Sequence, residues 1–295
     1  MSTVSVAVPR KGRPLEAVLE RVASRGGDAG LADDVVSTLR YEKAVTKGRQ
    51  HPDGTVYERL ESYSDTDGGP EYTLIRDGRD GFPRRIVFDA CTFAIGDHEV
   101  RLVGREEPFR ALRKHEFALG FDSADLVLEE VVELRPDPLA SLAEVNERID
   151  PRDTDVRVVG GLGDTVHHTL LATPAVADGP LGRSFVADYE GAFCISPRYE
   201  RLVEAVLGTD ALDGISFAYP GPDHAEEEAA IAEAGLGAYL TVTGGTAREH
   251  GLVVGERLFP SETVVLENAH EMDEGARAVA DALVQSVETA IAPKA

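Results

Sequence analysis

The chain has 295 residues, enough for one large domain or two ordinary ones with a substantial core. Its 53 acidic residues against 30 basic ones give a formal charge of −23, which argues against nucleic acid or an anionic membrane as a partner. The N-terminal residues show no secretory leader, and no apolar run is long enough to span a membrane, so we expect a cytoplasmic protein. Because lysine is rare among the basic residues, the acidic surface also predicts halophilic adaptation.

Cys91 and Cys194 are the only cysteines, and neither has a histidine or second cysteine at ligand spacing. We therefore expect two reduced structural thiols and neither a disulfide nor a metal site built by the protein.

Strand-like and helix-like runs alternate along most of the chain, which predicts an α/β fold with parallel strands. A strand at 4–8, a turn at 9–14 and a helix from residue 15 open the chain. Between about 41 and 95, closely spaced glycines predict an insertion of meandering hairpins. Strands and helices then alternate up to a strand expected at 131–134.

Proline-containing segments at 136–138 and 150–153 bracket a short helix and mark a predicted crossing between two lobes. We expect lobe I to comprise residues 1–135 and 256–295, and lobe II to comprise residues 155–255. Lobe II is expected to hold strands at 156–159, 185–188, 215–219 and 239–242 and helices at 197–207 and 225–234. A strand at 263–266 and a helix at 273–291 return to lobe I. The acidic run 226–228 reads as the solvated start of a helix.

A glycine-threonine loop, Thr243-Gly244-Gly245-Thr246, follows the strand expected at 239–242 and precedes a short helix. Such a turn directs backbone N–H groups, hydroxyls and the positive end of a helix dipole to one point, which suits a phosphate. An ordinary glycine-rich turn with Thr246 as the helix N-cap explains the same pattern. Since no Walker lysine follows, this is not an ATPase P-loop.

Arg10, Lys11 and Arg13 cluster in the turn after the first strand, although the chain uses basic residues sparingly. Cations at the carboxyl end of a strand suit an anionic substrate, and exposed solubilising charges would leave the same pattern. The adjacent His167 and His168 have no third ligand nearby, so they are weak evidence for a metal site or a catalytic base.

Five segments carry a further pattern: residues 6–16, 108–129, 185–190, 219–223 and 243–252. They resemble, in the same order, a Pro-Lys-Gly-Arg-Leu turn, a Val-Asp-Leu-Gly-Ile-x-Gly-x-Asp stretch, Arg-Val-Ala-Thr-x-Tyr-Pro, Leu-x-Gly-Ser-Val-Glu and Thr-Gly-x-Thr-Leu-Arg-x-Asn-Gly-Leu. These are segments of the ATP phosphoribosyltransferases, which catalyse the first step of histidine biosynthesis. The resemblance implies two α/β lobes of the type II periplasmic-binding-protein plan with a cleft between them.

The resemblance also implies transfer of a phosphoribosyl group from phosphoribosyl pyrophosphate (PRPP) to N1 of ATP, with Mg²⁺ on the pyrophosphate leaving group. It assigns the 5′-phosphate to the loop 243–246 and gives Lys11 and Arg13 catalytic roles against the pyrophosphate or ATP. The family's regulatory domain would follow the loop and is not expected in this chain, which implies a short-type member. Such a member would act as a homo-oligomer or with a separate regulatory subunit.

The strand expected before the loop lacks the acidic residue that the family uses for the ribose hydroxyls, and Pro222 stands where the family has serine. The alternative is therefore a diverged relative that binds a phosphorylated metabolite, or uses another acceptor, without this reaction. A solute-binding protein for transport shares the two-lobed plan but would need a secretion signal or lipid anchor.

Overall fold

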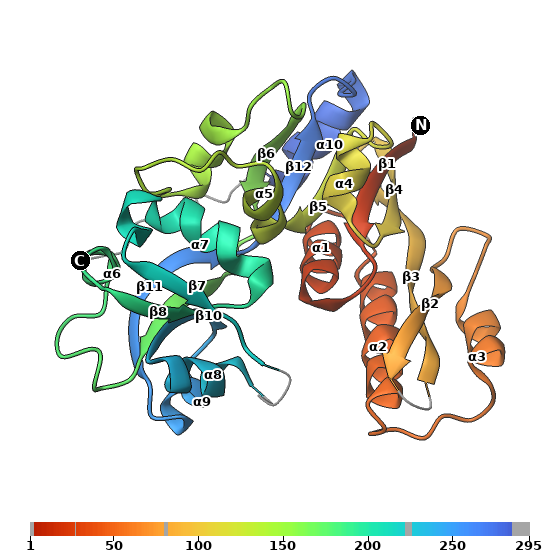
Figure 1. Cartoon of the computed structure of the whole chain (residues 1–295). Coiled ribbons are helices and arrows are strands. Elements are labelled where there is room, and N and C mark those ends of the chain that lie inside the picture. Colours follow the sequence, from red (N-terminus) through yellow and green to blue (C-terminus); the bar gives the residue numbers. More distant parts are fainter. Residues whose placement is uncertain (1–2, 27, 80–81, 222–225, 285–295) are drawn as a thin grey trace. The chain divides into compact units, whose positions relative to one another are not determined.

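The computed structural model describes residues 3–26, 28–79, 82–221 and 226–284, which form two compact units (Figure 1). Unit 1 holds the described residues up to Asp122, then Asp155–Gly163 and those from Thr263 onward. Unit 2 holds Ser123–Thr154 and Asp164–Glu262. Residues 123–135 and 256–262 thus fall in unit 2, whereas the sequence placed them in lobe I. Residues 155–163, with the strand predicted at 156–159, fall in unit 1, whereas the sequence placed them in lobe II.

Unit 1 is built on a seven-stranded sheet with the order β2-β3-β4-β1-β5-β12-β6. β1 runs parallel to both β4 and β5, and β12 runs antiparallel to β6. The strands are β1 (Thr3–Pro9), β2 (Glu71–Arg79), β3 (Phe82–Ile95), β4 (His98–Arg105), β5 (Leu119–Ser123), β6 (Val156–Gly161) and β12 (Thr263–Asn268). The helices are α1 (Gly12–Ser24), α2 (Ala29–Thr46), α3 (Val56–Tyr63), α4 (Pro108–Arg113) and α10 (Glu274–Val284).

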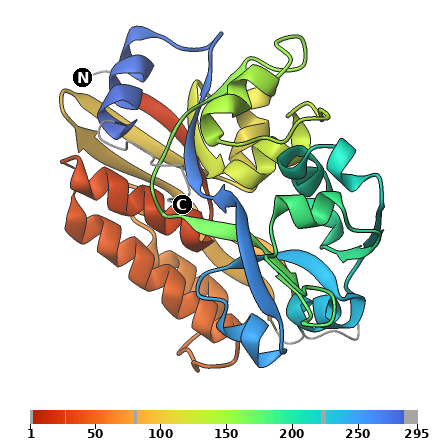
Figure 2. The same cartoon turned by 90° about the vertical axis from the view of Figure 1, so that its left-hand side faces the viewer.

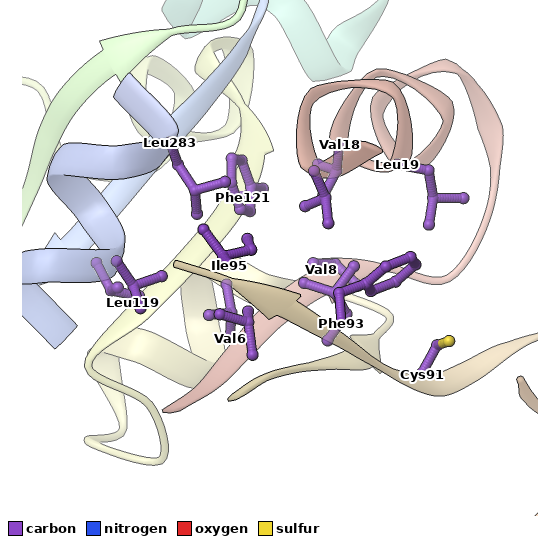
Figure 3. Close-up of a cluster of buried hydrophobic side chains, with 14 of the residues drawn as sticks. Val6, Val8, Val18, Leu19, Cys91, Phe93, Ile95, Leu119, Phe121 and Leu283 are labelled. Carbon is purple, nitrogen blue, oxygen red and sulfur yellow. The ribbon is translucent and has the colours of Figure 1, made fainter. Parts of the chain in front are cut away.

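The core of unit 1 forms where α1 covers β1 and β3. Val8 of β1 and Phe93 of β3 face Val18 and Leu19 of α1 in Figure 3, and all four side chains are buried in one cluster. Each fully buried aliphatic side chain contributes roughly 1.5–3 kcal/mol, so this cluster gives unit 1 a core of its own. α1 and α2 lie side by side in the same unit (Figure 2).

The prediction of hairpins between 41 and 95 is right for β2 and β3 but wrong for the segment before them. Residues up to Thr46 continue α2, and α3 follows behind a capping box made by Thr55 and Glu58. The helical pattern of α2 is hidden because Glu42 occupies a buried position, where it accepts hydrogen bonds from Arg59. A pattern of apolar residues does not reveal a helix that buries a paired charge.

Unit 2 is built on a five-stranded sheet with the order β11-β7-β10-β8-β9. β8 is parallel to β9 and β10, whereas β7 is antiparallel to β10 and β11. The strands are β7 (Val166–Ala172), β8 (Gly191–Cys194), β9 (Ile215–Ala218), β10 (Leu236–Thr241) and β11 (Val253–Ser261). Each unit is thus a mixed sheet with helices, which confirms the α/β fold class and the division into two lobes.

Two strands predicted from the sequence are absent from the described part of unit 2, which has the following helices. The α-helices are α5 (Ala124–Glu130), α6 (Arg183–Ala187), α7 (Glu200–Leu207), α8 (Glu227–Ala234) and α9 (Gly245–Glu249), and the 3₁₀ helices are η1 (Leu142–Arg148), η2 (Pro197–Tyr199) and η3 (Asp210–Leu212). The strand expected at 185–188 is wrong because α6 lies there. The strand expected at 131–134 is also wrong: only Val132 pairs there, in an isolated bridge with Ile149.

Cys91 and Cys194 are free and buried, and burial raises the pKa of each thiol to about 11. Within the described residues, no helix has both the length and the apolar composition that crossing a membrane requires.

Candidate functional site

A pocket of about 460 Å³ opens in unit 2 around the glycine-threonine loop. Its lining comes from three consecutive segments of the fold: the start of α8, the end of β10, and the loop that connects β10 to α9. The lining residues are Glu226, Glu227, Glu228, Tyr239, Leu240, Thr241, Val242, Thr243, Gly244, Gly245 and Thr246. All four loop residues predicted from the sequence therefore lie together in one pocket.

The loop turns sharply at Gly244, which precedes α9 and has a φ of 69°. This left-handed conformation is unfavourable for residues that carry a Cβ. A Cβ at Gly244 would also lie 3.0 Å from Cγ2 of Val254. Backbone conformation and packing therefore both require glycine here, and the turn leaves the N–H groups of Gly245 and Thr246, at the start of α9, without helical acceptors.

Arg248 on α9 brings a positive charge to the loop. Its exposed guanidinium donates a hydrogen bond from Nη1 to the carbonyl oxygen of Thr243 at 2.9 Å. Arg248 matches the arginine of the Thr-Gly-x-Thr-Leu-Arg-x-Asn-Gly-Leu motif, but the sequence did not assign it a role.

Carboxylates line the part of the pocket formed by α8. Glu227 is hydrogen-bonded to the hydroxyl of Tyr239, and burial first, then this carboxylate, raise the pKa of Tyr239. Glu226 Oε2 lies 2.8 Å from Nε2 of His250, and Glu228 is buried. The run 226–228 is therefore more than a solvated helix start, and the pocket offers acceptors for hydroxyl groups near the donors of the loop.

A hydroxyl contact fixes the end of β10 where the loop begins, and apolar packing holds the two helices beside it. Thr241 Oγ1 donates to Thr169 Oγ1 on β7 at 2.6 Å. Side chains of α8, α9 and β7 share one buried cluster that includes Ile231, Ala247 and Leu171. The same apolar packing thus positions both the carboxylates of α8 and the loop.

A family model described as halobacterial ATP phosphoribosyltransferase matches residues 1–293. The chain belongs to this family. The resemblance to ATP phosphoribosyltransferases that the sequence motifs indicated is therefore confirmed.

Similar solved structures include the ATP phosphoribosyl transferase (HisG:HisZ) complex from Thermotoga maritima, at 17% identity over 95% of this chain and 96% of that chain, with a TM-score of 0.39. YhfZ from Shigella flexneri is 10% identical over 96% of this chain and 85% of that chain, with a TM-score of 0.44. An ABC transporter periplasmic substrate-binding protein from Coxiella burnetii is 11% identical over 95% and 91% of the two chains, with a TM-score of 0.35. No curated protein matches the chain.

The two basic residues predicted to be catalytic in this ATP phosphoribosyltransferase family member lie in unit 1. Lys11 precedes α1 at the carboxyl end of β1, and its Nζ lies 3.7 Å from Oε2 of Glu106. Arg13 follows in the first turn of α1. Their roles stay predictions, because the pocket around the loop is formed by unit 2 alone.

The remaining candidates concern metals and histidines. No group of three or more His, Cys, Asp or Glu side chains within the described part of the chain is arranged to hold a metal ion. His167 and His168 lie on β7, so that they point to opposite faces of the sheet. His168 is completely buried.

Proposed function

We propose that the protein is a phosphoribosyltransferase that transfers the phosphoribosyl group of PRPP to N1 of ATP and releases pyrophosphate, the first step of histidine biosynthesis. Membership of the halobacterial ATP phosphoribosyltransferase family supports this proposal. The observation that carries it is the pocket of unit 2, in which the loop 243–246 faces the carboxylates of α8. The activity belongs in the cytoplasm of a salt-adapted cell.

The proposed donor site uses both kinds of group in this pocket. The N–H groups of Gly245 and Thr246, the Thr246 hydroxyl and the charge of Arg248 would bind the 5′-phosphate. Glu227 would accept hydrogen bonds from the ribose hydroxyls, with its carboxylate oriented by Tyr239. Glu227 thus supplies from α8 the acidic group that β10 does not carry.

The proposed reaction breaks the bond between the ribose anomeric carbon and pyrophosphate while N1 of ATP forms the new bond. Positive charge develops on the ribose and negative charge on the leaving group, so fixed charges stabilise the transition state. We assign Lys11 and Arg13 to the pyrophosphate or ATP. Mg²⁺ is usually held by substrate phosphates with one or two carboxylates, and we propose that it accompanies PRPP and neutralises the leaving group.

Isothermal titration with PRPP and Mg²⁺ in high salt tests the donor site. We expect binding by the native protein, and its loss in Thr246→Ala and Gly244→Asp variants. Thr209→Ala, in unit 2 but outside the pocket lining, is the control and should bind normally. Absence of heat at millimolar PRPP, from protein shown to be folded, would contradict the proposal.

The alternative function is binding of a phosphorylated metabolite without phosphoribosyl transfer to ATP. The absence of an acidic residue in β10, Leu236–Thr241, favours it. Release of pyrophosphate when both PRPP and ATP are present distinguishes the two functions. If PRPP binds and no pyrophosphate appears, the assay is repeated at the concentration where the protein is oligomeric and with candidate regulatory subunits, because we propose that the short-type member acts in one of these two forms.

A further inference from the structure

Unit 2 contains a buried polar cluster that the proposed reaction does not use. Asp125 of α5, His168 of β7 and Ser261 of β11 meet there. Ser261 Oγ donates to Asp125 Oδ2 at 2.9 Å, and His168 Nε2 lies 3.4 Å from the same oxygen. The ring of Tyr199 on η2 contacts the imidazole edge to face, with centroids 4.9 Å apart.

The hydrogen bonding of this cluster is incomplete. Among the described residues, Asp125 Oδ1 and both ring nitrogens of His168 are buried without a hydrogen-bond partner. Only 4% of Asp125 and none of His168 is exposed. Buried polar groups are normally paired, because removing them from water without replacing its hydrogen bonds costs free energy. Apolar residues in such positions are often equally or more stabilising, so stability does not account for this pair.

The pair is connected to the pocket through β7. This strand lies between β11 and β10, where His168 is opposite both Phe259 and Leu240. The next residue, Thr169, makes the hydroxyl contact with Thr241. Leu240 and Thr241 line the pocket immediately before the loop. A displacement of His168 therefore reaches the loop through one strand pairing.

Tyr199 provides a second connection. Burial raises the pKa of its hydroxyl, and the charge of Asp125 is the next contribution. Glu227 raises it as well, so the Tyr199 hydroxyl interacts electrostatically both with the buried pair and with the carboxylate in the pocket. Arg198 and Glu129, 3.4 Å apart, are further charges around this tyrosine.

We propose that Asp125 and His168 are positioning residues that set the end of β10, and with it the loop 243–246, for PRPP. The inference rests on the proposed function of that loop. Asp125, held by Ser261, determines where the imidazole lies, and the imidazole determines the position of β7 against β10. Neither side chain needs to touch the ligand.

The test separates this role from a purely structural one by comparing stability with affinity. His168→Phe and Asp125→Asn are titrated with PRPP and with ATP, and their melting temperatures are measured in the same buffer. We expect His168→Phe to melt at a lower temperature, because it leaves the Asp125 carboxylate buried without the imidazole. Its Kd for PRPP should rise by at least about tenfold, because the displaced loop loses contacts to the ligand. Its Kd for ATP should change by less than about twofold, which corresponds to a change in binding free energy smaller than RT.

Val279→Ala, at a fully buried position of α10 in unit 1, is the control for lost stability. It should lower the melting temperature and leave the Kd for PRPP unchanged. Unchanged PRPP affinity in both cluster variants, or equal losses for PRPP and ATP, would overturn the inference. If His168→Phe does not fold, the isosteric Asp125→Asn decides by the same criterion. A native protein that does not bind PRPP would instead refute the proposed function.

Discussion

Arg248 and Thr243 are joined by a hydrogen bond of 2.9 Å from the guanidinium Nη1 to the carbonyl oxygen, so a side chain of α9 holds the loop that precedes the helix. Replacing Arg248 with alanine removes this contact and a positive charge at the pocket. Hydrogen bonds of charged groups contribute about 1.5–3 kcal/mol, so we expect the Kd for PRPP to rise at least about tenfold. Titration calorimetry measures the change.

Arg248→Lys is the matched variant, because it keeps the charge but not the planar geometry of the guanidinium. Its Kd for PRPP should lie between those of the native protein and Arg248→Ala. An alanine variant with native affinity would show that Arg248 has no part in binding.

Gly244 and Gly245 provide a test of the loop geometry. Gly244→Ala should destabilise the protein by about 1–2 kcal/mol, because alanine at a φ of 69° is strained and its Cβ would meet Val254 at 3.0 Å. In Gly245→Ala the nearest atom, Thr243 Oγ1, is at an ordinary 3.6 Å, so we expect a much smaller loss. Denaturant unfolding at constant salt measures both, and equal losses would contradict this account of the turn.

Glu42 and Arg59 form a buried ion pair between α2 and α3, with Nε at 2.8 Å and Nη2 at 3.1 Å from the two carboxylate oxygens. Glu42→Gln would leave the guanidinium charge without its partner, and we expect a loss of about 3 kcal/mol in the free energy of unfolding. Arg40 and Glu16 form an exposed pair at 2.7 Å, so Glu16→Gln should cost less than about 1 kcal/mol. Urea unfolding measures both variants. A larger loss of unfolding free energy in Glu16→Gln than in Glu42→Gln would contradict this prediction.

His167 makes stability depend on pH. Burial, followed by the charge of Arg257, lowers the pKa of this imidazole from its usual 6.5. The unfolded chain therefore binds the proton more readily, and the contribution of His167 to stability is present above pH 6.5 and lost as the pH falls through the folded pKa. In His167→Gln the melting temperature should fall less between about pH 8 and about pH 5 than in the native protein. Parallel pH profiles of the two proteins would contradict the assignment.

Much of the fold follows from local patterns. The first strand and helix are predicted correctly because Val8, Val18 and Leu19 fall at the periods of a buried strand and of a covering helix. β7 is missed because its start, with His167 and His168, lacks the apolar character of a buried strand. Burial of His168 depends on Asp125 and Tyr199, which the chain brings from distant segments.

In the candidate site, too, features formed by adjacent residues are predictable from the sequence, whereas features formed by distant segments are not. The turn at Gly244 and the short helix after it are evident from the sequence, since glycine and threonine at these spacings define a turn and a helix start. The parts contributed by other elements are not. Glu227 reads as one charge in an acidic run until α8 and β10 bring it to Tyr239. Ser261 and Asp125 are 136 residues apart, and no local pattern relates them.

The order of strands in unit 1 has a consequence for synthesis on the ribosome. β12, made near the end of the chain, lies between β5 and β6, so β6 cannot join the sheet until Thr263–Asn268 has emerged. All the strands of the unit 2 sheet, β7 to β11, are translated before then. Until then, the β5 edge of the nascent unit 1 sheet stays unpaired, and an unpaired strand edge can pair with other chains and aggregate. Completion of its sheet comes late in biogenesis, and this edge is where chaperone protection would matter most.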